Sequence, residues 1–139
     1  MDNEKIVEII RSWKGTKWIH SQSLKGVGVD CIQFVVSVGK ELNWLPSDYK
    51  TIKYTRDWAI HNDRSILLEE LNKVCNKIPI TDLQIGDILV FKFGKCAGHS
   101  GFYIGNNRIV HSKIRAGVIE EVLNRKSVDS VWRVKNGLI

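Results

Sequence analysis

The sequence has few of the residues that mark disulfide-rich or disordered chains. Its 139 residues include three cysteines and two prolines. An odd number of widely spaced cysteines does not form a disulfide framework, so we expect the chain to fold in a reducing compartment. Charged residues make up 26% of the chain and hydrophobic residues 43%, which excludes the composition of a disordered protein.

Long apolar runs are also missing from the sequence. No segment approaches the run of about 18 apolar residues that a membrane-spanning helix requires. The first residues, MDNEK, are charged, and the apolar stretch after them is too short for a signal peptide. We therefore expect no integral membrane association, and synthesis in the cytoplasm. A chain of this length is expected to form one domain over residues 1–139 and to bury about two thirds of its unfolded surface.

Acidic residues are fewer than basic ones, 15 against 21, which gives a net charge of +6. The segment from Arg108 to the C-terminus holds seven of the basic residues and three of the acidic ones. A solvated surface explains this excess, and so does attraction to an anionic polymer such as nucleic acid or the bacterial envelope. Because no helix-turn-helix, zinc-finger or RNA-recognition pattern is present, we expect no nucleic-acid partner.

Apolar spacing and turn residues predict an α+β fold, with helices first and strands second. Helices are predicted from the N-cap Asp2 to Gly15, over 31–42 behind the N-cap Asp30, and over 63–75. Strands are predicted over 88–93, 99–104, 107–113, 117–122 and 130–135. We expect the N-terminal helices to pack on a C-terminal antiparallel sheet of about five strands.

One cysteine has the sequence context of a nucleophile. Cys31 follows Asp30 directly and opens the apolar run CIQFVVSV. A cysteine attacks as its thiolate, and a helix N-terminus together with a nearby imidazolium lowers the pKa of a thiol. His99 and His111 lie in predicted strands downstream and supply imidazoles. A lone cysteine on a helix is more often a small buried hydrophobe, so the histidines carry much of this interpretation.

The register of one hairpin decides whether the two histidines meet. If Ile104 pairs with Arg108 across a three-residue loop, His111 lies opposite Gly101, and His99 is its diagonal neighbour about 7–8 Å away. A two-residue loop would put the histidines on opposite faces of the sheet. Gly101 leaves space in front of the His99 face, which suits a cleft.

The first register gives each residue a role. His99 takes the proton of Cys31, and His111 orients His99 through its second nitrogen. The backbone N–H of Cys31 and a donor from the preceding loop form the oxyanion hole. The predicted reaction is acyl transfer, most simply amide hydrolysis through a thioester, and it needs no cofactor and no metal.

The remaining cysteines and histidines carry weaker signals. Cys75 and Cys96 are predicted to be structural. His61 is predicted to be a surface or core residue. The loop that leads into the nucleophile contains His20 and Gln22, which we take as candidate substrate-binding residues.

The order of these motifs resembles the NlpC/P60 family of papain-like cysteine peptidases. That family has an Asp-Cys pair opening a helix, a Gly-Asp turn before a strand, a His-x-Gly segment, and a second histidine on the following strand. The corresponding segments here, over roughly residues 13–135, are Asp30-Cys31, Gly86-Asp87-Ile88-Leu89, His99-Ser100-Gly101-Phe102-Tyr103-Ile104-Gly105 and Val110-His111. The segment 15–31 resembles the short branch found in phage-tail and gene-transfer-agent clusters.

The resemblance implies a papain-like fold and hydrolysis of amide bonds in peptidoglycan stem peptides, typically between D-glutamate and diaminopimelate or lysine. It implies that Cys31 is the nucleophile, His99 the base and His111 the third polar residue, and that Asp30 binds a substrate amine. Stem peptides and phage tail proteins are the implied partners. The implied place of action is a virus particle, or the medium after lysis.

One departure from the family pattern, and two alternatives, bear on this function. The family usually has Ser-Gly after the cysteine, whereas this chain has Ile32-Gln33, which leaves the catalytic pair intact and affects the substrate pocket. A thioester serves an acyltransferase or thioesterase equally well. A catalytically silent phage tail module would have an unreactive Cys31 and would use its basic C-terminal third to hold an anionic envelope.

Overall fold

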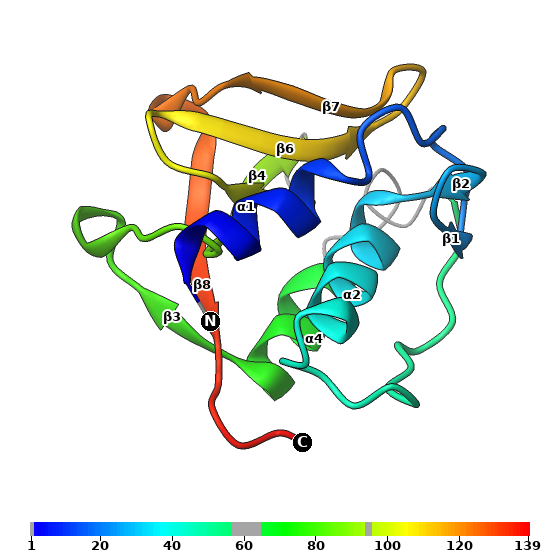
Figure 1. The fold of residues 1–139 in the computed structure, drawn as a ribbon, viewed down its shortest axis with the longest axis horizontal. Coiled ribbons are helices and arrows are strands. Elements are labelled where there is room, and N and C mark those ends of the chain that lie inside the picture. Colours follow the sequence, from blue (N-terminus) through cyan, green and yellow to red (C-terminus); the bar gives the residue numbers. More distant parts are fainter. Residues whose placement is uncertain (1, 57–64, 94–95) are drawn as a thin grey trace.

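The computed structural model describes residues 2–56, 65–93 and 96–139. Its α-helices are α1 (Asn3–Arg11), α2 (Cys31–Glu41) and α4 (Ile66–Val74), and short 3-10 turns cover Ile80–Asp82 and Arg125–Ser127. Its strands are β1 (Ser23–Leu24), β2 (Gly28–Val29), β3 (Cys75–Ile78), β4 (Ile88–Phe93), β5 (Cys96–Tyr103), β6 (Arg108–Lys113), β7 (Gly117–Val122) and β8 (Val128–Val134). Figure 1 shows β6 and β7 above α1 and α2. The α+β class is confirmed.

The first two helices begin at the predicted N-caps. Asp2 Oδ1 accepts a hydrogen bond from the backbone N–H of Lys5, and Asp30 Oδ1 accepts one from Gln33, both at 2.8 Å. These bonds satisfy N–H groups that have no partner within a helix. For the third helix, the predicted start at Asp63 lies outside the described residues.

The sheet has six antiparallel strands, in the order β3-β8-β4-β5-β6-β7, rather than about five. The additional strand is β3, whose first residue was predicted to end the third helix. Cys75 pairs with Val134 of β8 and is buried, whereas Asn76 and Lys77 are exposed. Only four residues long and half polar, β3 takes its conformation from pairing with a strand far along the chain, which local spacing does not reveal.

Both faces of the sheet are buried. Ile88 and Val90 of β4 belong to the cluster that includes the helices, whereas the alternating residues Leu89 and Phe91 belong to a second cluster. The larger cluster is built around aromatic contacts, in which the rings of Phe34, Trp13 and Phe102 meet edge to face. The second cluster also contains Ile109, Leu123 and Val131.

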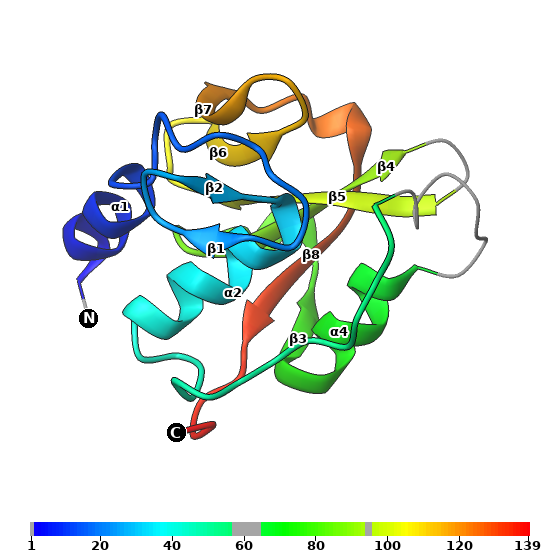
Figure 2. The same ribbon diagram turned by 90° about the vertical axis from the view of Figure 1, so that its right-hand side faces the viewer.

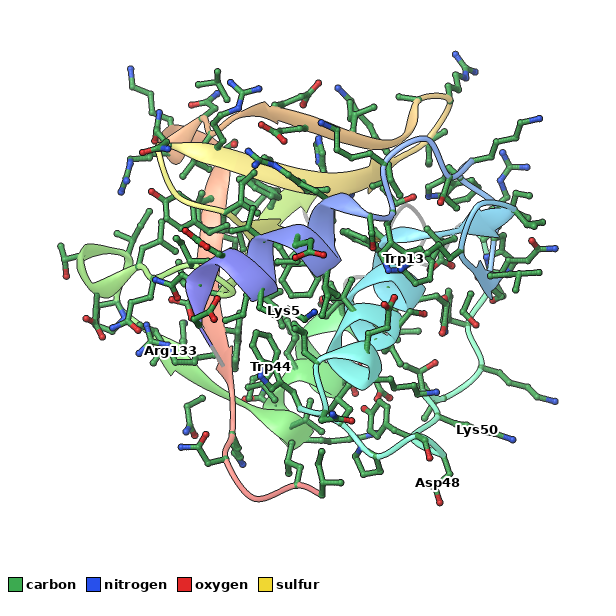
Figure 3. All side chains as sticks on the ribbon, in the orientation of Figure 1. Lys5, Trp13, Trp44, Asp48, Lys50 and Arg133 are labelled. Carbon is green, nitrogen blue, oxygen red and sulfur yellow. The ribbon has the colours of Figure 1, made fainter. Side chains whose placement is uncertain are left out.

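Polar contacts join α1 to its neighbours. Trp13 lies beside α2 in Figure 3, and its Nε1 donates to Glu41 Oε1 at 2.6 Å. Glu120 of β7 accepts hydrogen bonds from Arg11 at 2.9 Å and from Arg108 at 2.7 Å. The longest described helix has 11 residues, and no described helix combines the length and apolar character needed to cross a bilayer.

Candidate active site

Cys31 is the first residue of α2 and lies against β5. Its Sγ is 4.0 Å from the carbonyl oxygen of Gly98, and the residue is 8% exposed. Two buried serines fix this helix start. Ser100 Oγ donates to the carbonyl oxygen of Cys31 at 3.1 Å, and Ser112 Oγ donates to that of Val29 at 2.6 Å. Figure 2 shows the first turn of α2 beside β5, so the backbone holds the thiol next to the strand that carries the first histidine.

A β-bulge lies at the same point of β5. Phe91 of β4 pairs with His99, whereas the next residue, Lys92, pairs with Ala97. Gly98 is therefore one extra residue in β5, and bulges of this kind re-aim side chains and often lie next to active sites. The rings of His99 and Phe91 have centroids 5.9 Å apart. The extra residue of the bulge, Gly98, is the one that the Cys31 thiol contacts, and it directly precedes His99.

The hairpin of β5 and β6 has the predicted register. The backbone N–H of Ile104 donates to the carbonyl oxygen of Arg108 at 3.1 Å, which closes the three-residue loop. His99 Nε2 and His111 Nδ1 are 2.7 Å apart, within hydrogen-bond distance. The expected open space at Gly101 is wrong, because a Cβ there would lie 2.8 Å from the Cβ of His111. The missing side chain makes room for His111 rather than for a cleft.

The second histidine of this pair, His111, also contacts the carboxylate of Glu121. His111 Nε2 is 2.9 Å from Glu121 Oε2, and the side chain of His111 is 7% exposed. Sequence reasoning missed Glu121. The register of β6 and β7 pairs His111 with Ile119, so Glu121 is a diagonal neighbour on the same face. The diagonal relation that brings the two histidines together therefore also places this carboxylate beside His111.

The thiol and the first histidine are both uncharged at neutral pH. Burial, reinforced by the negative charge of Asp30, raises the pKa of Cys31 to about 12. Burial also lowers the pKa of His99 to about 3, with smaller contributions from His111 and Lys113. The expectation of a lowered thiol pKa is therefore wrong in direction. Burial and the adjacent carboxylate outweigh the favourable position at a helix N-terminus.

Asp30 stands at the centre of a second group of polar residues. Its Oδ2 accepts hydrogen bonds from the backbone N–H of Ser21 at 2.8 Å and from the Tyr54 hydroxyl at 2.6 Å, in addition to the N-cap bond on Oδ1. His20 Nδ1 is 4.0 Å from Oδ2, and the His20 ring meets the Tyr54 ring edge-on at 5.4 Å. The structure therefore brings His20 to Asp30, and the chain's own donors surround the carboxylate.

Gln22 does not join this group. Its Oε1 lies against Gly28 of the β1–β2 hairpin, 2.6 Å from the position that a Cβ would take there. In contrast, Tyr54 and Gln33 do belong to the group, because Gln33 Nε2 donates to the Tyr54 hydroxyl at 3.3 Å and to Thr51 Oγ1 at 3.2 Å. Sequence reasoning missed Tyr54, since the segment around it has no periodic pattern.

The other singled-out residues lie apart from these groups or outside the described residues. Cys75 is buried without a disulfide at the end of α4, and burial raises the pKa of its thiol to about 12. His61 and the side chain of Cys96 lie outside the described residues. Within the parts of the chain that the structure describes, no group of three or more His, Cys, Asp and Glu side chains is placed to hold a metal ion.

Known proteins resemble this chain in sequence and in fold. Over 120 residues it is 28% identical to the Escherichia coli murein DD-endopeptidase MepS/murein LD-carboxypeptidase, and this match covers 86% of the chain and 54% of the relative. The chain thus spans about half the length of the curated relatives that it matches.

Two solved structures illustrate the likeness in fold. The NlpC/p60 domain of the peptidoglycan hydrolase SagA has a TM-score of 0.64 at 15% identity, with 97% of this chain and 99% of that domain covered. RipD of Mycobacterium tuberculosis, a non-catalytic NlpC/p60 domain protein, has a TM-score of 0.59 at 12% identity, with 98% of each chain covered. At these identities the likeness shows the fold alone.

A family model gives the assignment. The model of the NlpC/P60 family matches residues 12–135, which is most of the chain and contains every residue of the two polar groups described above. These comparisons do not distinguish the branch of short members found in phage tails. The chain belongs to the NlpC/P60 family.

Proposed function

We propose that this chain is a cysteine peptidase that hydrolyses amide bonds in the stem peptides of peptidoglycan. Membership of the NlpC/P60 family and the sequence likeness to a murein endopeptidase support a cell-wall hydrolase. One observation carries the cysteine mechanism. The Cys31 thiol lies 4.0 Å from the residue before His99, and His99 is hydrogen-bonded to His111 at 2.7 Å.

The proposed reaction starts from a neutral thiol and a neutral imidazole. Sγ of Cys31 attacks the amide carbonyl carbon while Nδ1 of His99 takes the thiol proton, so no thiolate has to form beforehand. The backbone N–H of Cys31, in the first turn of α2, is a donor for the oxyanion because such N–H groups have no partner within a helix. His99 then gives the proton to the leaving amine. Water hydrolyses the resulting thioester with His99 again acting as base.

Two kinds of bond are candidates for the substrate. The family resemblance favours the amide between D-glutamate and diaminopimelate or lysine. The relative's name instead gives DD-endopeptidase and LD-carboxypeptidase activities. We propose the first bond, because His20, whose side chain is 33% exposed and lies 4.0 Å from Asp30, is a polar group near Cys31 that the free amine of a short stem peptide can approach.

Mass spectrometry of peptidoglycan tests the proposal. Purified peptidoglycan is incubated with the wild type, with Cys31→Ala and with Cys75→Ala, and melting curves verify that each variant is folded. New stem-peptide fragments are expected from the wild type and from Cys75→Ala, but not from Cys31→Ala, and their masses identify the bond. Equal fragments from Cys31→Ala would refute the cysteine mechanism.

A binding function without hydrolysis is the second candidate. The raised pKa of Cys31 favours it, since a thiol that stays protonated is a poor nucleophile unless a base acts on it. The non-catalytic relative of similar fold, RipD, shows that the fold occurs without catalysis. If wild type and Cys31→Ala both sediment with peptidoglycan and neither releases fragments, this second function replaces the first.

A further inference from the structure

We propose that Glu121 is a positioning residue that sets the tautomers of both histidines and so leaves Nδ1 of His99 free to act as the base. This inference rests on the proposed function and adds a residue to the site. Glu121 acts through His111 rather than on the substrate. Its contact with His111 is direct, with 2.9 Å between Oε2 and Nε2.

The carboxylate of Glu121 fixes the position of the proton on the His111 ring. An ionised carboxylate only accepts hydrogen bonds, so the nitrogen that it contacts must carry a proton. His111 Nε2 is therefore the N–H nitrogen of this ring. A neutral imidazole has one N–H, which leaves His111 Nδ1 as a bare acceptor. Burial lowers the pKa of His111 despite the nearby Glu121, so the ring is neutral.

The tautomer of His111 determines the tautomer of His99. His111 Nδ1 accepts, so His99 Nε2, at 2.7 Å, must donate and must carry the proton of its own ring. The remaining nitrogen of His99 is Nδ1, which then holds a lone pair. No hydrogen bond to Nδ1 of His99 comes from the described residues, so in the proposed reaction this lone pair is the one that takes the thiol proton.

Lys113 and His111 hold the Glu121 carboxylate in place. Its other oxygen, Oε1, is 3.6 Å from the Lys113 ammonium of β6, while Oε2 contacts His111. The side chain of Glu121 is 40% exposed and that of His111 is 7% exposed. The charged and titratable groups that face His111 are therefore His99 from β5, Lys113 from β6 and Glu121 from β7. Of these three groups, the Glu121 carboxylate is the one that can only accept a hydrogen bond from His111.

Glu120 provides a matched control on the same strand. Successive residues of a strand point to opposite faces, and Glu120 instead bonds to Arg11, Lys14 and Arg108. Glu120→Ala thus removes a carboxylate of the same size and charge without touching either histidine.

Nitrogen NMR of the imidazole rings tests the proposal without substrate. Long-range proton–nitrogen spectra of the wild type at neutral pH are expected to show both histidines with a proton on Nε2 and none on Nδ1. In Glu121→Ala, His111 and His99 are expected to become mixtures of tautomers, whereas Glu120→Ala keeps the wild-type pattern. A wild type with the proton on Nδ1 of His99, or an unchanged pattern in Glu121→Ala, would overturn the proposal.

Kinetics give a second measure for a chain that cleaves peptidoglycan. Glu121→Ala is expected to lower kcat about tenfold with little change in KM, because the wrong tautomer of His99 removes the base without altering substrate contacts. Failure of this proposal is distinguishable from failure of the proposed function. The NMR result needs no activity, and a wild type that cleaves while Glu121→Ala is unchanged refutes only the role of Glu121.

Discussion

At the scale of single residues, Cys31 combines a reactive position with a local environment that keeps its thiol protonated. The thiol opens α2, where the helix dipole favours a negative charge, yet burial and Asp30 disfavour one. The pKa of His99 moves the opposite way for the same reason, since its charged form is the one that burial disfavours. A reaction at this site therefore depends on moving a proton during attack.

The thiol pKa is testable by alkylation. We expect iodoacetamide to react slowly with Cys31 near neutral pH, and the rate to keep rising above pH 9, because thiolate forms only as pH approaches the pKa of about 12. Asp30→Asn keeps one oxygen, which can still accept the N-cap bond from Gln33, and removes the negative charge, so the pKa of Cys31 should fall and the rate should rise. Peptide mapping separates Cys31 from the other cysteines. A rate that levels off near neutral pH would contradict this prediction.

The site residues that could be predicted from the sequence are those that lie in helices and strands with a regular pattern. Cys31, His99 and His111 follow an N-cap or a strand alternation, and the turn residues between β5 and β6 fixed which faces they share. Tyr54 comes from a loop without periodicity, and only the folded chain brings it to Asp30. The direction of the thiol pKa also depends on burial, which is a property of the assembled core.

At the scale of elements, the site depends on how closely β5 and β6 approach at Gly101. A Cβ at this position would meet the Cβ of His111 at 2.8 Å and the carbonyl oxygen of Val110 at 3.0 Å. Real Cβ atoms do not come so close to such neighbours without a shift of the backbone. Glycine at position 101 is therefore required by the strand contact that brings the two histidines together.

Gly101→Ala tests this strand contact. We expect a loss of about 1–3 kcal/mol in the free energy of unfolding, because the added methyl overpacks a buried contact and displaces His111. Urea unfolding measures this loss, and the peptidoglycan assay should show a fall in activity along with it. Unchanged stability together with unchanged activity would mean that β6 accommodates the methyl group and that the contact is not needed.

Some elements of the sheet could be predicted from local sequence patterns and others could not. The strands β4, β6 and β7 lie close to their predicted bounds, since alternation and flanking turn residues define them. In contrast, β3 comes from pairing with β8, which is distant in sequence, and the bulge at Gly98 comes from a shift of register against β4 that the alternation of residues does not reveal. Local spacing therefore predicted the sheet and the hairpin that carries the histidines, while the irregular point next to Cys31 required the structure.

At the scale of the whole molecule, the half-buried His99 links stability to pH. The pKa of His99 is about 3 in the folded protein against 6.5 as the ordinary value, so the unfolded chain binds more protons between these values. The stabilisation is complete above pH 6.5 and is lost as pH falls toward 3. This single group accounts for about 2 kcal/mol between pH 7 and pH 5.

Urea unfolding at both pH values measures this effect. The wild type is expected to lose stability on acidification, whereas His99→Gln, which keeps a donor for His111 but does not titrate, should lose about 2 kcal/mol less. The titrating groups that do not contact His99 are common to both proteins and cancel in the comparison. Parallel pH dependence in the two proteins would show that His99 is not protonated on unfolding.

The join between β2 and α2 has a consequence for the design of new enzymes. Ser100 and Ser112 hold this join through the main-chain carbonyl oxygens of Cys31 and Val29, and neither bond involves the thiol. These two bonds do not require a particular side chain at position 31, provided that it fits the buried space that Cys31 fills. A serine, which is close to cysteine in size, is expected to stand at this position with the strand and both histidines unmoved, so the scaffold separates the identity of the attacking atom from its placement.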